Sequence, residues 1–304
     1  MSPIAILTVY CVLILLASLA GGWVPMLVRL THKRMQLAIS LVAGFMLGVG
    51  LLHLLPHALM QSQSIDNVVI WILIGFLVMF FIERFFCFHH HDAPEEHDNN
   101  HNHDREQAHE QHKLTWSGAA VGLTLHSLIA GFGLAASIQA ESPAGEHGTL
   151  PGLAVFLVIF LHKPFDSMTL GALLALGRWS VAWRHLVNAL FALAIPAGAI
   201  LFYMGVAWLG EGDSQTVGLA LAFVTGTFLC IAMSDLLPEL QFHHHDRIKL
   251  SSALILGLAL AWTISHFESQ SHEHHEHHAQ LDHQPLDHNH EPPSATIEAD
   301  AQSH

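Results

Sequence analysis

The feature that most constrains this sequence is a series of long apolar stretches that contain almost no charged residue. About a quarter of the residues in a soluble domain are charged, whereas only 12% are charged here, and those cluster in short polar breaks. About 20 apolar residues in a helix can cross the hydrocarbon core of a bilayer. We therefore predict an all-α membrane protein, with helices at roughly residues 4–28, 35–59, 68–88, 114–138, 150–176, 186–209, 217–240 and 250–266.

The basic residues predict how these spans are oriented. Of the 11 Lys and Arg residues, all except Lys163 fall in or beside alternate connections: Arg29, Lys33, Arg34, Arg84, Arg105, Lys113, Arg178, Arg184, Arg247 and Lys249. The positive-inside rule places those connections in the cytoplasm and both termini on the extracytoplasmic side. Seven spans is the competing count, because the eighth stretch is short and the third ends in charged residues. An odd number would spoil the alternation, which favours eight.

The chain divides into four segments on this basis. Residues 1–88 hold membrane helices 1–3, 89–113 form a cytoplasmic loop, 114–266 hold helices 4–8, and 267–304 form an extracytoplasmic tail. The loop and the tail are rich in histidine and poor in apolar residues, which predicts that they are disordered. Solvated filler is one interpretation of such tracts, and loose metal capture is the one we favour. The loop candidates for metal capture are His89, His90, His91, His101 and His103.

Ionisable side chains occur in the middle of two predicted spans, where each costs at least about 2.5 kcal/mol to insert. His126 is near the centre of the fourth span and His162 near the centre of the fifth, so both are expected at the bilayer midplane. Asp166 follows His162 by one helical turn and shares its face. Two imidazoles and a carboxylate suit zinc or iron. Pro164 is expected to interrupt the helix between His162 and Asp166, as happens at transport sites. A hydrogen-bonded packing role is the alternative for a single buried histidine.

A second pattern links spans two and seven. His53 and His57 flank a Leu-Leu-Pro sequence in span two, and Asp235 and Glu239 flank the same sequence in span seven. Because the two spans run in opposite directions, the match is a weak sign of an inverted repeat. All four residues lie near helix ends. They are candidates for an entry and exit relay, with interfacial anchoring as the equal alternative.

These motifs resemble the ZIP (Zrt/Irt-like) family of metal transporters. The match rests on the His-Ser-x-x-x-Gly motif that begins at His126, the His-Lys-x-x-x-Ser motif that begins at His162, and the two Leu-Leu-Pro sequences. The resemblance implies eight helices in a 3+2+3 arrangement, a homodimer, and zinc import through a midplane site between helices 4 and 5. It implies His126, Ser127, His162 and Asp166 as metal ligands.

Two positions depart from the family pattern. Ala130 stands where the family usually has a carboxylate, and Lys163 stands where many members have a second acidic ligand. A fixed cation repels a metal ion about as strongly as it attracts a carboxylate. We therefore predict a single-metal site in which the charge of Lys163 substitutes for the second ion.

The transported substrate is predicted to be Zn²⁺, with Fe²⁺, Mn²⁺ and Cd²⁺ as other candidates. A metal exporter and a non-transporting metal sensor remain the alternatives. An enzyme is not expected, since no His-Glu-x-x-His sequence occurs, and the net charge of −14 argues against nucleic-acid binding. Protonated imidazole does not bind metal, so import should weaken as the external pH falls through about 6. The expected location is the inner (plasma) membrane of a bacterium.

Overall fold

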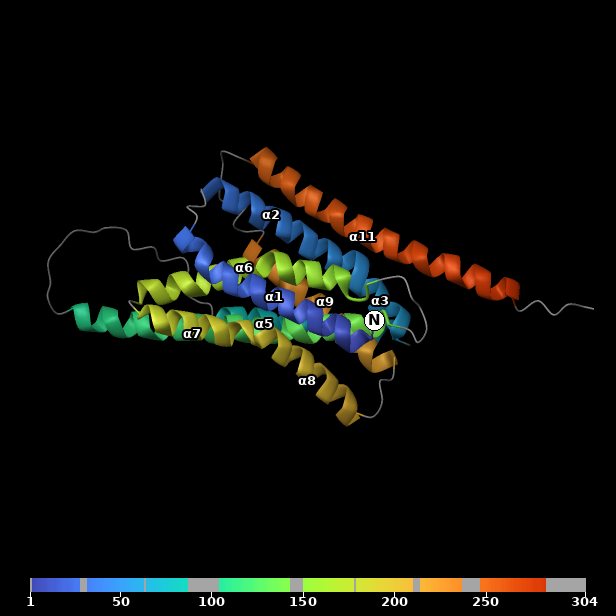
Figure 1. The fold of residues 1–304 in the computed structure, drawn as a ribbon, viewed down its shortest axis with the longest axis horizontal. Coiled ribbons are helices and arrows are strands. Elements are labelled where there is room, and N and C mark those ends of the chain that lie inside the picture. Colours follow the sequence, from blue (N-terminus) through green and yellow to red (C-terminus); the bar gives the residue numbers. More distant parts are fainter. Residues whose placement is uncertain are drawn as a thin grey trace, which may run out of the picture.

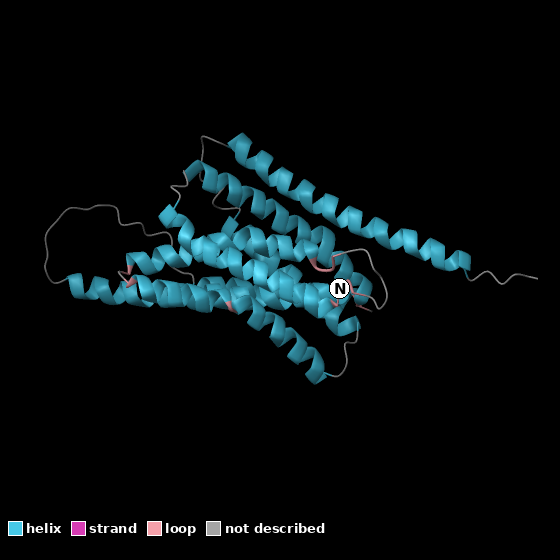
Figure 2. Cartoon of the chain, viewed as in Figure 1, coloured by secondary structure: helices cyan, strands magenta, loops and turns pink. Residues whose placement is uncertain are grey.

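The protein is described by a computed structural model that covers residues 2–27, 32–62, 64–86, 104–142, 150–177, 179–209, 214–236 and 247–282. Within these ranges every regular element is a helix (Figure 2). Eight helical stretches there are long and apolar enough to cross a membrane: Pro3–Gly22, Lys33–Gln61, Ile65–Phe86, Ser117–Ala140, Leu153–Leu176, Val181–Val206, Ser214–Ser234 and Arg247–His266. The prediction of an all-α protein with eight spans is confirmed.

Five of the spans are single helices and three are composite. The single helices are α1 (Pro3–Leu27), α4 (Ile65–Phe86), α5 (Asp104–Ala140), α6 (Leu153–Leu176) and α11 (Arg247–Asp282). Helix α6 continues through Pro164, so the interruption expected there is wrong. The second span joins α2 (His32–Gly48), η1 (Val49–Leu54) and α3 (Leu55–Gln61). The sixth joins α7 (Val181–Ala192) and α8 (Ala194–Leu209), and the seventh joins α9 (Ser214–Ile231) and η2 (Ala232–Leu236).

The break in the sixth span has a local cause. Proline cannot donate a backbone hydrogen bond, and its ring collides with the carbonyl four residues earlier. Pro196 stands four residues after Ala192, the residue at which α7 ends. The single helix expected over 186–209 is therefore two helices, which begin earlier, at Val181.

The two Leu-Leu-Pro sequences have the same local structure. Both η1 and η2 are π-helical, and each ends at the first leucine of its Leu-Leu-Pro sequence. In span two the proline leaves the carbonyl of Leu52 without its usual helical donor. The hydroxyl of Ser265 in α11 donates to that carbonyl at 2.6 Å, which satisfies it. The wide turn is thus anchored to a neighbouring span.

The packing of the spans is symmetric. Helix α4 packs along α9 and α2 along α11, while α1 packs along α6 and α5 along α8. Figure 1 shows α11 beside α2 at one edge of the bundle. Spans one, two and three can be matched with spans six, seven and eight, and span four with span five. Under this matching the α4–α9 contact corresponds to the α2–α11 contact, and the α1–α6 contact corresponds to the α5–α8 contact. The contacts between α9 and η1, and between α2 and η2, obey the same relation. The packing therefore agrees with an inverted repeat.

Reciprocal glycines occur where three of these helix pairs cross. A methyl group on either glycine of a pair would meet a backbone carbonyl oxygen of the opposite helix. The pairs are Gly44 with Gly257, Gly75 with Gly226, and Gly131 with Gly198. In α1, a methyl group on Gly21 would lie 2.5 Å from the carbonyl oxygen of Pro164 in α6. Small residues of this kind let membrane helices approach closely.

The two segments predicted to be disordered are partly helical, which corrects that expectation. Helix α5 begins at Asp104, before the predicted start at residue 114, and α11 continues to Asp282, beyond residue 266. Extending an existing helix avoids the nucleation step, so neighbouring Glu, Gln and Ala residues can join it readily. Residues 89–103 and 283–304 lie outside the described residues, and so do all five candidate histidines of the loop.

Candidate metal sites

His126 and His162 face each other across the interface between α5 and α6. Together with Asp166 they are called the midplane cluster, after the depth that the sequence predicts for them. The ring centroids of His126 and His162 are 5.5 Å apart. Asp166 Oδ2 lies 3.7 Å from His126 Nε2 and 3.9 Å from His162 Nε2. The three ligand atoms all fall within 4.8 Å of one another. The fold thus brings together the three residues that the sequence distributes over two spans.

These distances suit a shared ion better than direct hydrogen bonds. Two ligands held tetrahedrally at about 2.1 Å from zinc lie about 3.4 Å apart, whereas an N–H···O hydrogen bond ends near 3.2 Å. Both His162 Nε2 and Asp166 Oδ2 are buried, and within the described part of the chain neither has a hydrogen-bond partner. A buried polar atom without a partner is unfavourable, and a bound cation would remove the penalty at both atoms.

The helix backbone orients His162. Its Nδ1 lies 2.7 Å from the carbonyl oxygen of Val158, one turn earlier in α6. A carbonyl can only accept, so in the neutral ring Nδ1 carries the proton and donates it there. The lone pair of Nε2 then points toward Asp166 and His126, which is the arrangement that a metal-binding imidazole requires.

Lys163 is fully buried beside these ligands. Its ammonium group donates to Ser127 Oγ, lies 3.9 Å from Asp166 Oδ2 and sits 3.6 Å from the centroid of the Phe191 ring. Ser127 Oγ in turn donates to the carbonyl of Leu123 at 2.7 Å. Ser127 therefore connects to the cluster through Lys163. Ala130, in place of the usual carboxylate, is buried in the core and offers no ligand atom.

A second group of ligand types lies at the C-terminal end of α5. His53 of η1, His57 of α3 and Glu141, just after α5, place their ligand atoms within 4.8 Å of one another. His53 Nε2 is 2.9 Å from Glu141 Oε1. Both histidines are among the candidates that the sequence predicts, whereas Glu141, which is 88 residues from His53, is not. The predicted topology offered a signal, since it puts the ends of spans two and four on the same side of the membrane.

The structure describes the other two relay candidates, Asp235 and Glu239, only in part. Asp235 belongs to η2, but its side chain is not described, and Glu239 lies outside the described residues. A different carboxylate occupies this region. Glu83 of α4 accepts a hydrogen bond from Ser234 Oγ at 2.5 Å and contacts the thiol of Cys230 at 3.8 Å. Glu83 is one of the charged residues that end the third stretch, and it is not among the candidates that the sequence offers.

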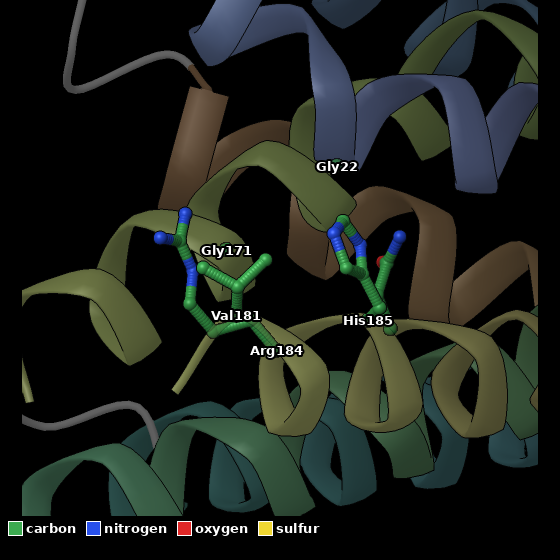
Figure 3. A pocket seen from close by; sticks show the side chains of 6 residues that line it. Gly22, Gly171, Val181, Arg184 and His185 are labelled. Carbon is green, nitrogen blue, oxygen red and sulfur yellow. The ribbon is translucent and has the colours of Figure 1, made fainter. Parts of the chain in front are cut away.

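Figure 3 shows a small pocket between α1, α6 and α7, with Arg184 and His185 among its lining side chains. The complete lining is Gly22, Gly171, Val181, Arg184, His185 and Asn188. None of the predicted metal ligands is among these residues, so the pocket is separate from both clusters.

The comparison with protein families decides the classification. The model described as the ZIP zinc transporter family matches residues 5–120 and 88–265, which together span most of the chain. The chain belongs to the ZIP family. The second matched stretch includes His126, His162 and Asp166, so the ZIP match covers the whole midplane cluster.

Curated relatives of this ZIP protein are zinc transporters from eukaryotes. Zinc transporter ZIP9-A of Xenopus laevis is 25% identical over 77% of this chain and 86% of its own length. Zinc transporter ZIP4 of Rattus norvegicus is 26% identical over 77% of this chain and 43% of its own length. Zinc transporter 3 of Arabidopsis thaliana is 27% identical over 46% of this chain and 41% of its own length. With the eight spans, these matches support an integral membrane protein that transports metal ions.

Proposed function

We propose that this ZIP protein imports zinc, or a similar divalent transition metal, into the cytoplasm through a site formed by His126, His162 and Asp166. The observation that carries the proposal is the convergence of three ligand atoms from two spans, at 3.7 and 3.9 Å from the shared carboxylate oxygen. His162 Nε2 is buried without a hydrogen-bond partner among the described residues, which supports it further.

The midplane site holds one metal ion in this proposal. Two unit charges about 4 Å apart interact by about 4 kcal/mol at an effective dielectric constant of 20. The ammonium group of Lys163 lies 3.9 Å from Asp166 Oδ2, so it would oppose a second cation beside the first. Its hydrogen bond to Ser127 holds it there. Ser127 keeps one lone pair for a further contact with the ion.

The proposal also includes a path for the metal ion through the helix bundle. We assign His53 and His57 to entry, and Asp235 and Glu239 to exit toward the cytoplasm. Glu83, which contacts η2 through Ser234, is a further candidate on the exit side. The loop histidines His89, His90, His91, His101 and His103 would collect the released ion. A location in a bacterial inner (plasma) membrane stays a prediction, because the relatives above are eukaryotic.

Radiotracer zinc uptake into cells expressing the chain tests the proposal. His126→Ala, His162→Ala and Asp166→Asn should each lower uptake at least about tenfold, the effect of roughly 1.4 kcal/mol of lost binding. His266→Ala is the matched control, because His266 is an exposed histidine on α11 that stacks on Trp262. Equal uptake by wild type and His126→Ala, at equal surface expression, would rule out the site.

The same assay separates the alternative functions. An exporter would lower the cellular zinc content relative to cells without the protein, and a sensor would leave it unchanged. Competition by Fe²⁺, Mn²⁺ and Cd²⁺ in this assay ranks the other candidate substrates. The expected homodimer is tested by the molar mass of the purified protein in detergent, measured by light scattering.

A further inference from the structure

We propose that His53, His57 and Glu141 form a second divalent-metal site, separate from the midplane cluster. The donor set is two imidazoles and one carboxylate, which suits Zn²⁺ and Co²⁺. Metal binding at this site does not depend on transport. Only its role as the first stop of an incoming ion rests on the proposed function.

The three side chains are placed for shared coordination. The rings of His53 and His57 meet edge to face with centroids 4.8 Å apart. His53 and Glu141 are buried, with His53 Nε2 2.9 Å from Glu141 Oε1. Two ligands of one zinc ion lie about 3.4 Å apart. An ion therefore needs this contact to open by only about half an ångström.

Glu141 is held in position from its other oxygen. Its Oε2 accepts a hydrogen bond from the backbone N–H of Gly152 at 2.6 Å, which leaves Oε1 directed at His53. Gly152 has a φ of 74°, and a side chain there would be 2.5 Å from Ile138. Ligand carboxylates in metal sites are typically fixed by such outer hydrogen bonds.

A further hydrogen bond joins the ends of α3 and α5 beside the site. Gln61 Nε2 at the end of α3 donates to the carbonyl of Ala140 at 3.0 Å, directly before Glu141. His53 belongs to the π-helical turn η1, and such turns occur frequently at functional sites. The hydrogen bond from Gln61 therefore links α3, which carries His57, to the end of α5 beside Glu141 without using a ligand atom.

The second site is distinct from the midplane site. Glu141 follows His126 by fifteen residues, which is about 22 Å along a helix axis. One ion cannot contact ligands of both clusters. The two are nevertheless linked, because Glu141 bonds the residue that precedes α6, and α6 carries His162 and Asp166. An ion on Glu141 thus acts directly on the start of the helix that holds the inner ligands.

Metal titration of the purified full-length chain in detergent tests this site. We would count tightly bound Zn²⁺ calorimetrically and confirm coordination with Co²⁺ absorption spectra. Glu141→Gln should remove one tight ion, His126→Ala should remove another, and the double variant should remove both. Glu141→Gln keeps the size of the side chain and can still accept from Gly152. Loose binding by the His-rich tracts is common to all variants and cancels in the differences.

His57→Ala provides the second variant, since it removes a ligand and leaves the contact between His53 and Glu141 intact. It should weaken the same ion at least tenfold and leave the melting temperature in chelator unchanged. If His126→Ala alone and the double variant of His126→Ala with Glu141→Gln bind the same number of tight ions, the second site does not exist. Unchanged uptake by His126→Ala would overturn the proposed function alone, because the titration counts ions without transport.

Discussion

The ammonium group of Lys163 shows how this chain accommodates a buried charge. A charge removed from water is unfavourable unless it is paired and hydrogen-bonded. Lys163 has a hydroxyl acceptor in Ser127, a carboxylate in Asp166 and the face of the Phe191 ring. The three partners come from α5, α6 and α7, so one side chain links three helices around the midplane cluster.

Replacing Lys163 tests whether its charge excludes a second ion. Lys163→Asp should raise the number of Zn²⁺ ions that depend on His126 from one to two, because it exchanges a repelling cation for a ligand. The number is measured as the difference in tight binding with and without His126→Ala. Lys163→Met removes the charge without adding a ligand and should leave one ion. Two ions in the unmodified protein would show that Lys163 has no such effect.

The external pH should control uptake through the same residues. Metal competes with the proton for imidazole, and free imidazole has a pKa near 6.5. Uptake should therefore fall as the external pH drops through about 6, because a protonated ring carries no free lone pair for the metal. The measurement is radiotracer uptake into proteoliposomes at fixed internal pH. A rise in uptake on acidification would contradict metal binding by neutral histidines.

At the scale of single elements, helices cross closely where both carry a glycine. Gly131 of α5 and Gly198 of α8 each face the backbone of the other helix. In a bilayer, association of helices relies on close packing rather than on burial from water. The α5–α8 contact therefore fixes the position of the helix that carries His126 and Ser127.

A pair of substitutions in α8 tests this packing. Gly198→Ala should destabilise the fold by about 1–3 kcal/mol, the usual effect of overpacking. Gly205→Ala is the matched control, because nothing lies within 4 Å of a methyl group placed there. Alanine favours helices over glycine by up to about 1 kcal/mol, so the control should be neutral or stabilising. Thermal unfolding in detergent gives both values. Equal melting temperatures would show that the α5–α8 crossing tolerates a side chain.

For the whole molecule, the helix packing and the π-helical turns both indicate two halves related by a pseudo-two-fold axis. The four principal helix pairs obey a pseudo-two-fold relation, and the π-helical turns before the two Leu-Leu-Pro sequences do the same. Inverted repeats of this kind place a substrate site near the membrane midplane, at the interface between the halves. His126 and His162 lie in spans four and five, which this relation exchanges. Each half therefore contributes a histidine from an equivalent span.

Cysteine labelling tests the orientation of the molecule. In a background without Cys11, Cys87 and Cys230, a cysteine at Ser2 should react with a membrane-impermeant maleimide in intact cells. A cysteine at Lys33, at the start of the second span, should react only after permeabilisation, because basic residues favour the cytoplasmic side. The reverse result would invert the topology and turn the proposed entry residues His53 and His57 into exit residues.

The sequence by itself determined the eight spans, and it predicted the depth of His126 and His162 in the bilayer. These are local properties, because the length of an apolar run and the rise per residue of a helix do not depend on partners. Only the tertiary structure decided that Glu141 joins His53 and His57, that Lys163 is held by Ser127, and that α5 pairs with α8. Such contacts join residues far apart in the chain. Their geometry depends on how whole helices pack, which leaves no periodic mark on either segment.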